Sequence, residues 1–131
     1  MRMRWFGIAI AIGLIAGCAG KQVVKSPQVP KDVQEGLASY YHDSLHGNLT
    51  ANGETYNRNA LTGAHRTLPF GTEVRVTNRT NGRSVRLRIN DRGPFVDGRI
   101  IDVSRRAAEL LDFVDGGVVE VRVEVVAIAA E

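Results

Sequence analysis

Alternation of apolar and polar residues is the feature that most limits what this 131-residue chain can fold into. From residue 119 to 125, valine occupies every second position and charged residues fill the positions between. Residues 73–77 and 84–90 alternate in a similar way. A period of two places apolar side chains on one face of a strand and polar side chains on the other. These runs therefore predict a sheet with one buried face and one face in water.

Turn and cap signals predict how the runs are connected. Asn81-Gly82 lies between two of the runs and is a strong hairpin signal, because both residue types tolerate positive φ. A helix is predicted over residues 105–111, where good helix formers follow Ser104 as the N-cap. A short helical turn is predicted over residues 61–66, before the next proline.

Shorter strands are predicted over residues 36–41 and 99–103. Several short strands with one or two short helices fit a small closed barrel better than a sandwich. Closure also removes the strand edges that would otherwise pair with other chains. We therefore predict a mainly β fold that closes into a barrel.

Residues 1–17 have the pattern of a secretory signal peptide. Arg2 and Arg4 precede an apolar run from residue 5 to 16. That run is shorter than the roughly 20 residues that a membrane-spanning helix needs. We therefore exclude this segment from the predicted fold.

The sequence Ile-Ala-Gly-Cys at residues 15–18 resembles a bacterial lipobox, in which the cysteine is lipidated. Cys18 is the only cysteine, so no disulfide can form within the chain, and acylation explains a lone thiol in an exported protein. The residue after the cysteine is Ala19 and not aspartate. By resemblance to Gram-negative lipoproteins, this implies that the protein is sorted to the outer membrane and faces the periplasm. The alternatives are an ordinary signal peptide with an incidental cysteine, or a marginal anchor helix.

The mature chain is predicted to have two parts. Residues 18–35 contain two prolines and little hydrophobic periodicity, which is typical of a flexible tether. Residues 36–127 would then form a single barrel domain.

The charge balance argues against nucleic-acid binding. The formal net charge of +3 falls to about +1 without Arg2 and Arg4, and the chain has no lysine-rich stripe or series of stacking aromatics. Arginine suits carboxylate recognition, because its planar fork binds both oxygens. A carboxylated polymer is therefore a sensible ligand class, although Arg75, Arg86 and Arg88 fit a solvated sheet face at least as well.

Three side chains suited to proton transfer lie among glycines and prolines: Glu54, His65 and Asp91. Such surroundings favour loops that a scaffold holds still, where catalytic groups tend to lie. Asp91 directly follows a predicted strand. Each of the three residues also has an ordinary interpretation as a turn, cap or packing residue.

A metal site is not predicted. His42 and His46 have the i, i+4 spacing that suits zinc on a helix, but the preceding tyrosines favour a strand and then a loop. No phosphate-binding glycine loop and no serine in a nucleophile elbow is present either. We expect no cofactor.

Four segments resemble the rare lipoprotein A family: GLASYYHDSLHG, TANGETYNRNALTGAHRTLPFGTEVRVTN, NGRSVRLRINDRGPFVDGRIIDVSRRAAELL and the terminal VEVRVEVV. The resemblance covers about residues 36–126. It implies a six-stranded double-psi β-barrel with one or two short helices. It also implies an endolytic septal-ring lytic transglycosylase that cleaves peptidoglycan between N-acetylmuramic acid and N-acetylglucosamine, and leaves a 1,6-anhydro end. The family prefers glycan strands without stem peptides.

The resemblance places the family's catalytic residues on Glu54, His65 and Asp91. In a lytic transglycosylase the C6 hydroxyl of the sugar is the nucleophile, so proximity replaces a bound water. One carboxyl group can then act first as acid and later as base, and we assign this role to Asp91. Glu54 and His65 would assist Asp91 by orienting or repelling its carboxyl group, or by stabilising charge on the sugar. The sequence does not tell which of the two does which.

Tyr41, Asn90 and Arg92 are predicted to contact the glycan; alternatively, Asn90 closes its strand and Arg92 pairs with a nearby aspartate. The predicted partners are peptidoglycan glycan strands, a membrane reached through the lipid anchor, and cell-division proteins. Many family members also carry a C-terminal SPOR domain. We expect none here, because the sequence ends at Glu131, directly after the predicted barrel.

Three other functions remain open. The first is a non-cutting glycan-binding or wall-loosening module, as in the expansins that share this barrel. The second is a hydrolase of wall polysaccharide. The third is a structural lipoprotein that binds division partners.

Overall fold

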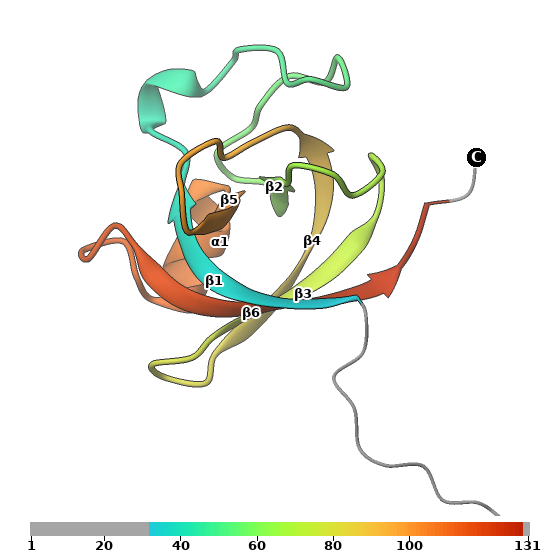
Figure 1. The fold of residues 1–131 in the computed structure, drawn as a ribbon. Coiled ribbons are helices and arrows are strands. Elements are labelled where there is room, and N and C mark those ends of the chain that lie inside the picture. The colour runs from blue at the N-terminus through green and yellow to red at the C-terminus, as the bar shows by residue number, and fades with distance from the viewer. Residues whose placement is uncertain (1–31, 130–131) are drawn as a thin grey trace, which may run out of the picture. The chain divides into compact units, whose positions relative to one another are not determined.

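The computed structural model describes residues 32–129. The predicted signal segment, Cys18 and the predicted tether up to residue 31 lie outside the described residues. The described part contains six strands and two short helices (Figure 1): β1 (Val33–Tyr40), η2 (Asp43–Leu45), β2 (Thr62–Ala64), β3 (Glu73–Asn78), β4 (Ser84–Asp91), β5 (Arg99–Val103), α1 (Arg105–Leu111) and β6 (Val119–Ala127).

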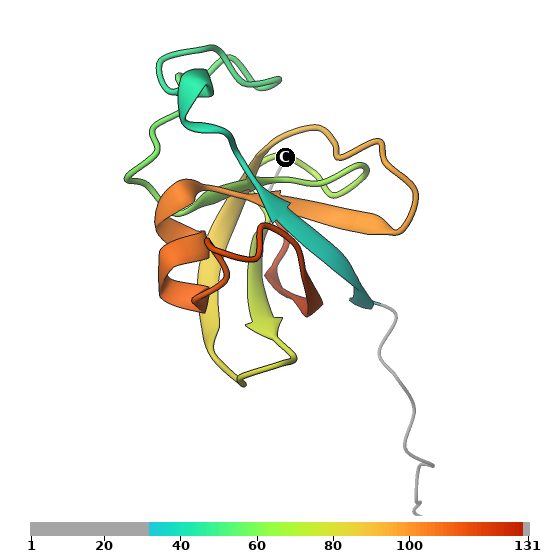
Figure 2. The same cartoon turned by 90° about the vertical axis from the view of Figure 1, so that its left-hand side faces the viewer.

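The strands form a closed barrel in the order β1-β5-β2-β4-β3-β6. The β1–β5 and β2–β4 pairs are parallel, and the other four pairs are antiparallel. Figure 2 shows the barrel from the side, with α1 packed against it. The prediction of a small, mainly β closed barrel is confirmed.

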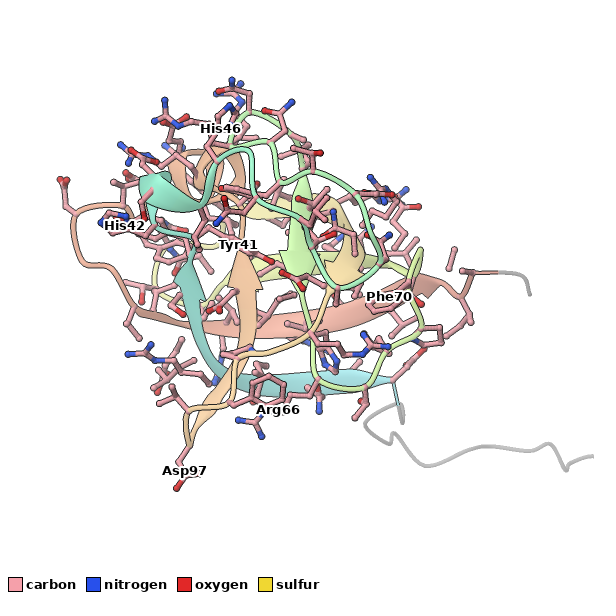
Figure 3. The ribbon with its side chains drawn as sticks, turned by 90° about the horizontal axis from the view of Figure 1, so that it is seen from above. Tyr41, His42, His46, Arg66, Phe70 and Asp97 are labelled. Carbon is pink, nitrogen blue, oxygen red and sulfur yellow. The ribbon has the colours of Figure 1, made fainter. Side chains whose placement is uncertain are left out.

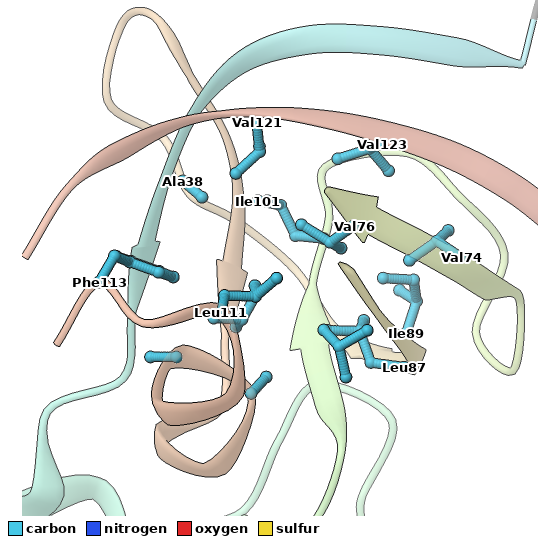
Figure 4. Packing of buried hydrophobic residues seen from close by; sticks show 14 residues of the cluster. Ala38, Val74, Val76, Leu87, Ile89, Ile101, Leu111, Phe113, Val121 and Val123 are labelled. Atoms are coloured by element: carbon cyan, nitrogen blue, oxygen red, sulfur yellow. The ribbon is translucent and has the colours of Figure 1, made fainter. Parts of the chain in front are cut away.

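The inward positions of the alternating runs form one apolar core (Figure 4). Full burial of each aliphatic side chain of this size contributes about 1.5–3 kcal/mol. The core side chains contributed by strands and by the helix include Val74, Val76, Leu87, Ile89, Ile101, Val103, Ala107, Ala108, Leu111, Val121 and Val123. Alternation in the sequence thus locates the core, because period-two patterning and burial coincide in β3, β4 and β6.

The predicted helix is confirmed over Arg105–Leu111, and the side chain of Ser104 accepts a hydrogen bond from the backbone N–H of Ala107 at 3.2 Å. The predicted helical turn over residues 61–66 is wrong, because Thr62–Ala64 form strand β2. This strand lies between β4 and β5 and pairs with both. Strand β1 begins at Val33, three residues before the predicted start, because its first residues pair with β6.

No helix within residues 32–129 is long and apolar enough to cross a membrane.

Candidate active site

Sheet register places two aspartates on either side of strand β2. Ala64 of β2 pairs with Asp91 of β4 on one side and with Asp102 of β5 on the other. Two neighbouring strand spacings separate their backbones by roughly 10 Å. Asp102 is also the partner of Ser39 in β1. The barrel therefore brings together two carboxyl groups, of which the sequence analysis had selected one.

Asp91 is held by three hydrogen-bond donors at the end of β4. Its Oδ2 accepts from the hydroxyl of Tyr41 at 2.5 Å. Its Oδ1 accepts from the backbone N–H of Ala51 at 2.8 Å and from that of Arg92 at 2.9 Å. Both oxygens therefore act as acceptors, and the carboxylate ties the loop that carries Ala51 to the end of the strand.

Tyr41 is a fixed donor to Asp91. Its ring stacks on that of Tyr56, with centroids 4.3 Å apart and planes at 15°. Burial raises the pKa of Tyr41 far above its ordinary value, and the hydrogen bond and charge of Asp91 raise it further. The hydroxyl therefore stays protonated. In Figure 3 Tyr41 lies near the middle of the face seen from above.

Asp102 is in a different environment. Its carboxyl group is half-buried and accepts a hydrogen bond from the hydroxyl of Ser39. Burial raises the pKa of Asp102, and the negative charge of Asp91 adds to this, whereas Ser39 and Arg99 act in the opposite direction. Two nearby carboxyl groups in unlike environments are a common basis for dividing acid and base roles.

Sequence reasoning missed Asp102. One signal was present, since an aspartate interrupts the apolar run Ile-Ile-Asp-Val of the predicted strand. Its importance comes from the pairing of β5 with β2, which the sequence alone does not specify.

Glu54 lies at the rim and is strongly ionised. Its Oε2 accepts from Arg88 Nη1 at 2.8 Å, and its Oε1 accepts from Asn90 Nδ2 at 3.0 Å. These hydrogen bonds, that from Arg88 first, lower the pKa of Glu54 to about 2. Its side chain is 42% exposed. A carboxylate of this kind accepts hydrogen bonds and is a poor proton donor.

His65 is buried, and its ring orders a turn. Its Nδ1 accepts from the backbone N–H groups of Thr67 at 3.1 Å and Leu68 at 3.2 Å. Its Nε2 therefore carries the proton and donates to Gln34 Oε1 at 2.7 Å. Burial lowers the pKa of His65, which favours the neutral ring that an accepting Nδ1 requires.

The connection of His65 to Asp91 runs through the main chain, where His65 N–H donates to the Asp91 carbonyl at 3.1 Å. Glu54 reaches Asp91 through its neighbour Asn90. The structure thus assembles Asp91 with Tyr41, Asn90 and Glu54, while the imidazole of His65 is occupied by its own turn.

Asn90 and Arg92 support this arrangement. Asn90 is buried and holds Glu54, as described above. Arg92 Nη1 donates to the carbonyls of Leu68 at 2.9 Å and His65 at 3.2 Å, and its guanidinium lies 4.0 Å from the centre of the Phe70 ring. Arg92 therefore clamps the turn that follows β2.

His42 and His46 are used in loop structure. His42 Nδ1 accepts from the backbone N–H of Ser44 at 3.0 Å, and His46 Nδ1 accepts from that of Arg58 at 3.1 Å. Among residues 32–129, no group of three or more histidine, cysteine or acidic side chains is placed to hold a metal ion.

Residues 33–123 match the model of the lytic transglycolase family. The chain belongs to this family. This confirms the resemblance read from the sequence motifs.

Two curated relatives carry the same name, endolytic peptidoglycan transglycosylase RlpA. The Campylobacter jejuni protein is 53% identical over 95 residues, which are 72% of this chain and 34% of the relative. The Neisseria meningitidis protein is 51% identical over 106 residues, which are 81% of this chain and 44% of the relative. The chain therefore spans between a third and a half of the length of these relatives.

Solved structures share the fold. The Streptomyces papain inhibitor superposes with a TM-score of 0.59 at 27% identity, over 73% of this chain and 96% of the inhibitor. The expansin of Clavibacter michiganensis also gives 0.59, at 18% identity, over 76% of this chain and 52% of the expansin. The expansin likeness shows that the barrel is of the expansin type.

Proposed function

We propose that this domain is an endolytic lytic transglycosylase that cleaves peptidoglycan between N-acetylmuramic acid and N-acetylglucosamine and leaves a 1,6-anhydro end. Family membership and the relatives' names support the activity. The single structural observation that carries the proposal is the pair of aspartates across β2, one held by three donors and one with a raised pKa.

In the proposed mechanism, Asp102 is the proton donor. Its raised pKa favours the protonated carboxyl group that a general acid needs near neutral pH. Asp102 gives its proton to the glycosidic oxygen as the bond from C1 of N-acetylmuramic acid to that oxygen breaks. The Asp91 carboxylate, oriented by Tyr41, stabilises the positive charge that develops on the sugar ring.

The same carboxyl group completes the reaction. The C6 hydroxyl attacks C1 and forms the 1,6-anhydro bond, and its proton passes to the Asp102 carboxylate, which restores the acid. No water is consumed. This proposal moves the acid role from Asp91, where the sequence analysis placed it, to Asp102, because Asp91 already accepts three hydrogen bonds.

Glu54 and His65 take supporting roles in this proposal. The ionised Glu54 accepts hydrogen bonds from sugar hydroxyl or amide groups at the rim. His65 is a positioning residue that shapes the turn after β2 and, through its backbone N–H, the end of β4. Tyr41, Asn90 and Arg92 also act by positioning, since each already holds a neighbouring group.

We also propose that the domain is lipid-anchored at Cys18 after removal of residues 1–17, on the periplasmic face of the outer membrane, with the segment before β1 as its tether. The lipobox-like sequence supports this proposal. Peptidoglycan glycan strands are the proposed substrate, and cell-division proteins are proposed partners.

The test is digestion of peptide-free glycan strands, followed by mass spectrometry for 1,6-anhydro ends. Wild-type protein and an Asp115→Asn control in the exposed turn after α1 should give anhydro products. Asp102→Asn and Asp91→Asn should give few or none.

Two other outcomes would replace the proposal. Reducing ends without anhydro rings would indicate a hydrolase. Tight binding with no cleavage by the wild type would indicate a non-cutting wall-loosening module, the alternative that the expansin-like barrel favours.

A further inference from the structure

We propose that Phe95 is a stacking platform for a sugar ring of the glycan strand and extends the candidate active site by one subsite. This inference rests on the proposed function for the identity of the ligand. The site is the loop between β4 and β5, which begins directly after Asp91 and ends at Gly98.

Phe95 is displayed to solvent to an unusual extent. The residue is 78% exposed, and the neighbouring Val96 is 50% exposed. An exposed aromatic ring forgoes the stabilisation that burial would bring. Single exposed hydrophobic residues are common on protein surfaces. The position of Phe95 on the loop that follows Asp91 is therefore the reason to look for a ligand that covers it.

The loop that carries Phe95 is held firmly by one arginine. Arg66 Nε donates to the Pro94 carbonyl at 2.6 Å, and Arg66 Nη2 donates to the carbonyls of Val96 at 2.9 Å and Arg99 at 3.0 Å. These three contacts fasten the loop on both sides of Phe95. A ring on a restrained loop loses little freedom when a ligand binds, which favours recognition.

Gly93 brings the ring close to the backbone at the start of the loop. Its φ is +120°, a conformation that favours glycine, and a Cβ there would lie 3.6 Å from the Phe95 ring. The ring therefore lies beside the chain that leads from Asp91. Phe95 is four positions after Asp91, so their Cα atoms are at most about 14 Å apart, a distance that a short oligosaccharide bridges.

The surroundings favour a sugar over other occupants. A pyranose has an apolar face of C–H groups that packs on an aromatic ring, and a polar edge of hydroxyl groups. The ring of Phe95 offers a small apolar surface. Charged Asp97 and Arg99 follow it in the sequence, and Arg66 donates to its loop. This surface is far smaller than the area that a stable protein interface buries.

A tryptophan reporter tests direct contact. Trp5 is the only tryptophan in the chain and lies outside the described residues. In a chain whose Trp5 is replaced by phenylalanine, Phe95→Trp should show a shifted emission maximum when peptide-free glycan strands are added. Val96→Trp in the same background is the matched control and should respond weakly. Equal responses from both positions, or no response from position 95, would overturn the platform.

Kinetics provide a second test that does not depend on the reporter. Phe95→Ala should raise KM for glycan strands about three- to tenfold, the size expected for one aromatic contact, with kcat nearly unchanged. Phe95→Tyr should restore the wild-type KM, and Val96→Ala should retain it. An unchanged KM in Phe95→Ala, while wild type and variant both produce anhydro ends, would refute the platform and leave the proposed function intact.

The reverse result is also distinguishable. If the wild type makes no anhydro ends but the tryptophan reporter still responds to glycan strands, the platform is retained and the proposed catalysis is lost. A response to vesicles of phosphatidylethanolamine and phosphatidylglycerol, with none to glycan strands, would assign Phe95 to a membrane surface and refute the inference.

Discussion

Replacement of Asp102 by asparagine separates a catalytic from a structural role. Asparagine is nearly isosteric, and its side-chain oxygen can still accept the Ser39 hydrogen bond. It has no proton to transfer. Loss of general acid catalysis typically costs a factor of about 10² to 10⁴ in rate, or about 3–5 kcal/mol of activation free energy. We therefore expect kcat to fall by that factor.

The stability of the same variant should move in the opposite direction. The folded-state pKa of Asp102 is raised, so the carboxyl group favours folding in its protonated form. This contribution is fully present below the ordinary aspartate pKa and is lost as pH rises through the folded-state value. Asparagine is neutral at every pH. The variant should therefore unfold at the same or a higher temperature than wild type at pH 7 to 8, with any advantage vanishing in acid.

The assay pairs anhydro-product rates with thermal unfolding from pH 4 to 8. Wild-type kcat should fall on the alkaline side as Asp102 loses its proton. Asp115→Asn should match wild type in both measurements. A variant that retains wild-type kcat would refute the assignment of Asp102 as the acid. A variant that loses activity only because it unfolds at assay temperature would refute the stability argument.

Three further perturbations follow from the structure and the sequence. Glu54→Gln should lower stability by less than about 1 kcal/mol at pH 7, because the ion pair that it removes is exposed. In thermal unfolding the difference from wild type should disappear as pH falls from 4.5 toward about 2, where Glu54 takes up its proton. Gly63→Ala should lower the free energy of unfolding, measured in urea, by about 1–3 kcal/mol, because the added Cβ would lie 3.0 Å from a main-chain oxygen of β5. Gly116→Ala is the control and should be tolerated better, since its added Cβ would have its nearest neighbour at 3.8 Å. Cys18→Ala should abolish metabolic labelling with palmitate, and persistent labelling would exclude this anchor.

Local patterning was sufficient to predict most of the barrel. Strands β3, β4 and β6 each have enough alternating residues to define a buried face, and Ser104 has a capping side chain that the structure uses. Strand β2 was not predictable in this way. It has only three residues, all buried, and it exists because β4 and β5 pair with it from both sides. Contacts distant in sequence outweigh local propensity at that position.

Sequence motifs were sufficient to predict the site residues that lie in loops. The site residue that depends on strand register was missed. Asp91 and Glu54 lie in recognisable loops, and the structure links them through Asn90. The environment of Asp102 depends on burial in the barrel and on the charge of Asp91, and neither can be read from neighbouring residues in the sequence. For His65 the residue type suggested a role in proton transfer. In the structure both ring nitrogens form hydrogen bonds, one with Gln34 and one within a turn.

Strand β2 explains why the two carboxyl groups can cooperate. It is the strand between them, and its residues at this level are the smallest available, Gly63 and Ala64. Ala64 packs with Tyr41 and Tyr56, and the hydroxyl of Tyr41 donates to Asp91. A larger side chain at position 64 would displace Tyr41 and with it the donor that orients Asp91. The pairing of β2 with both neighbours therefore sets the spacing of the carboxyl groups, and the small residues on β2 keep the donor in place.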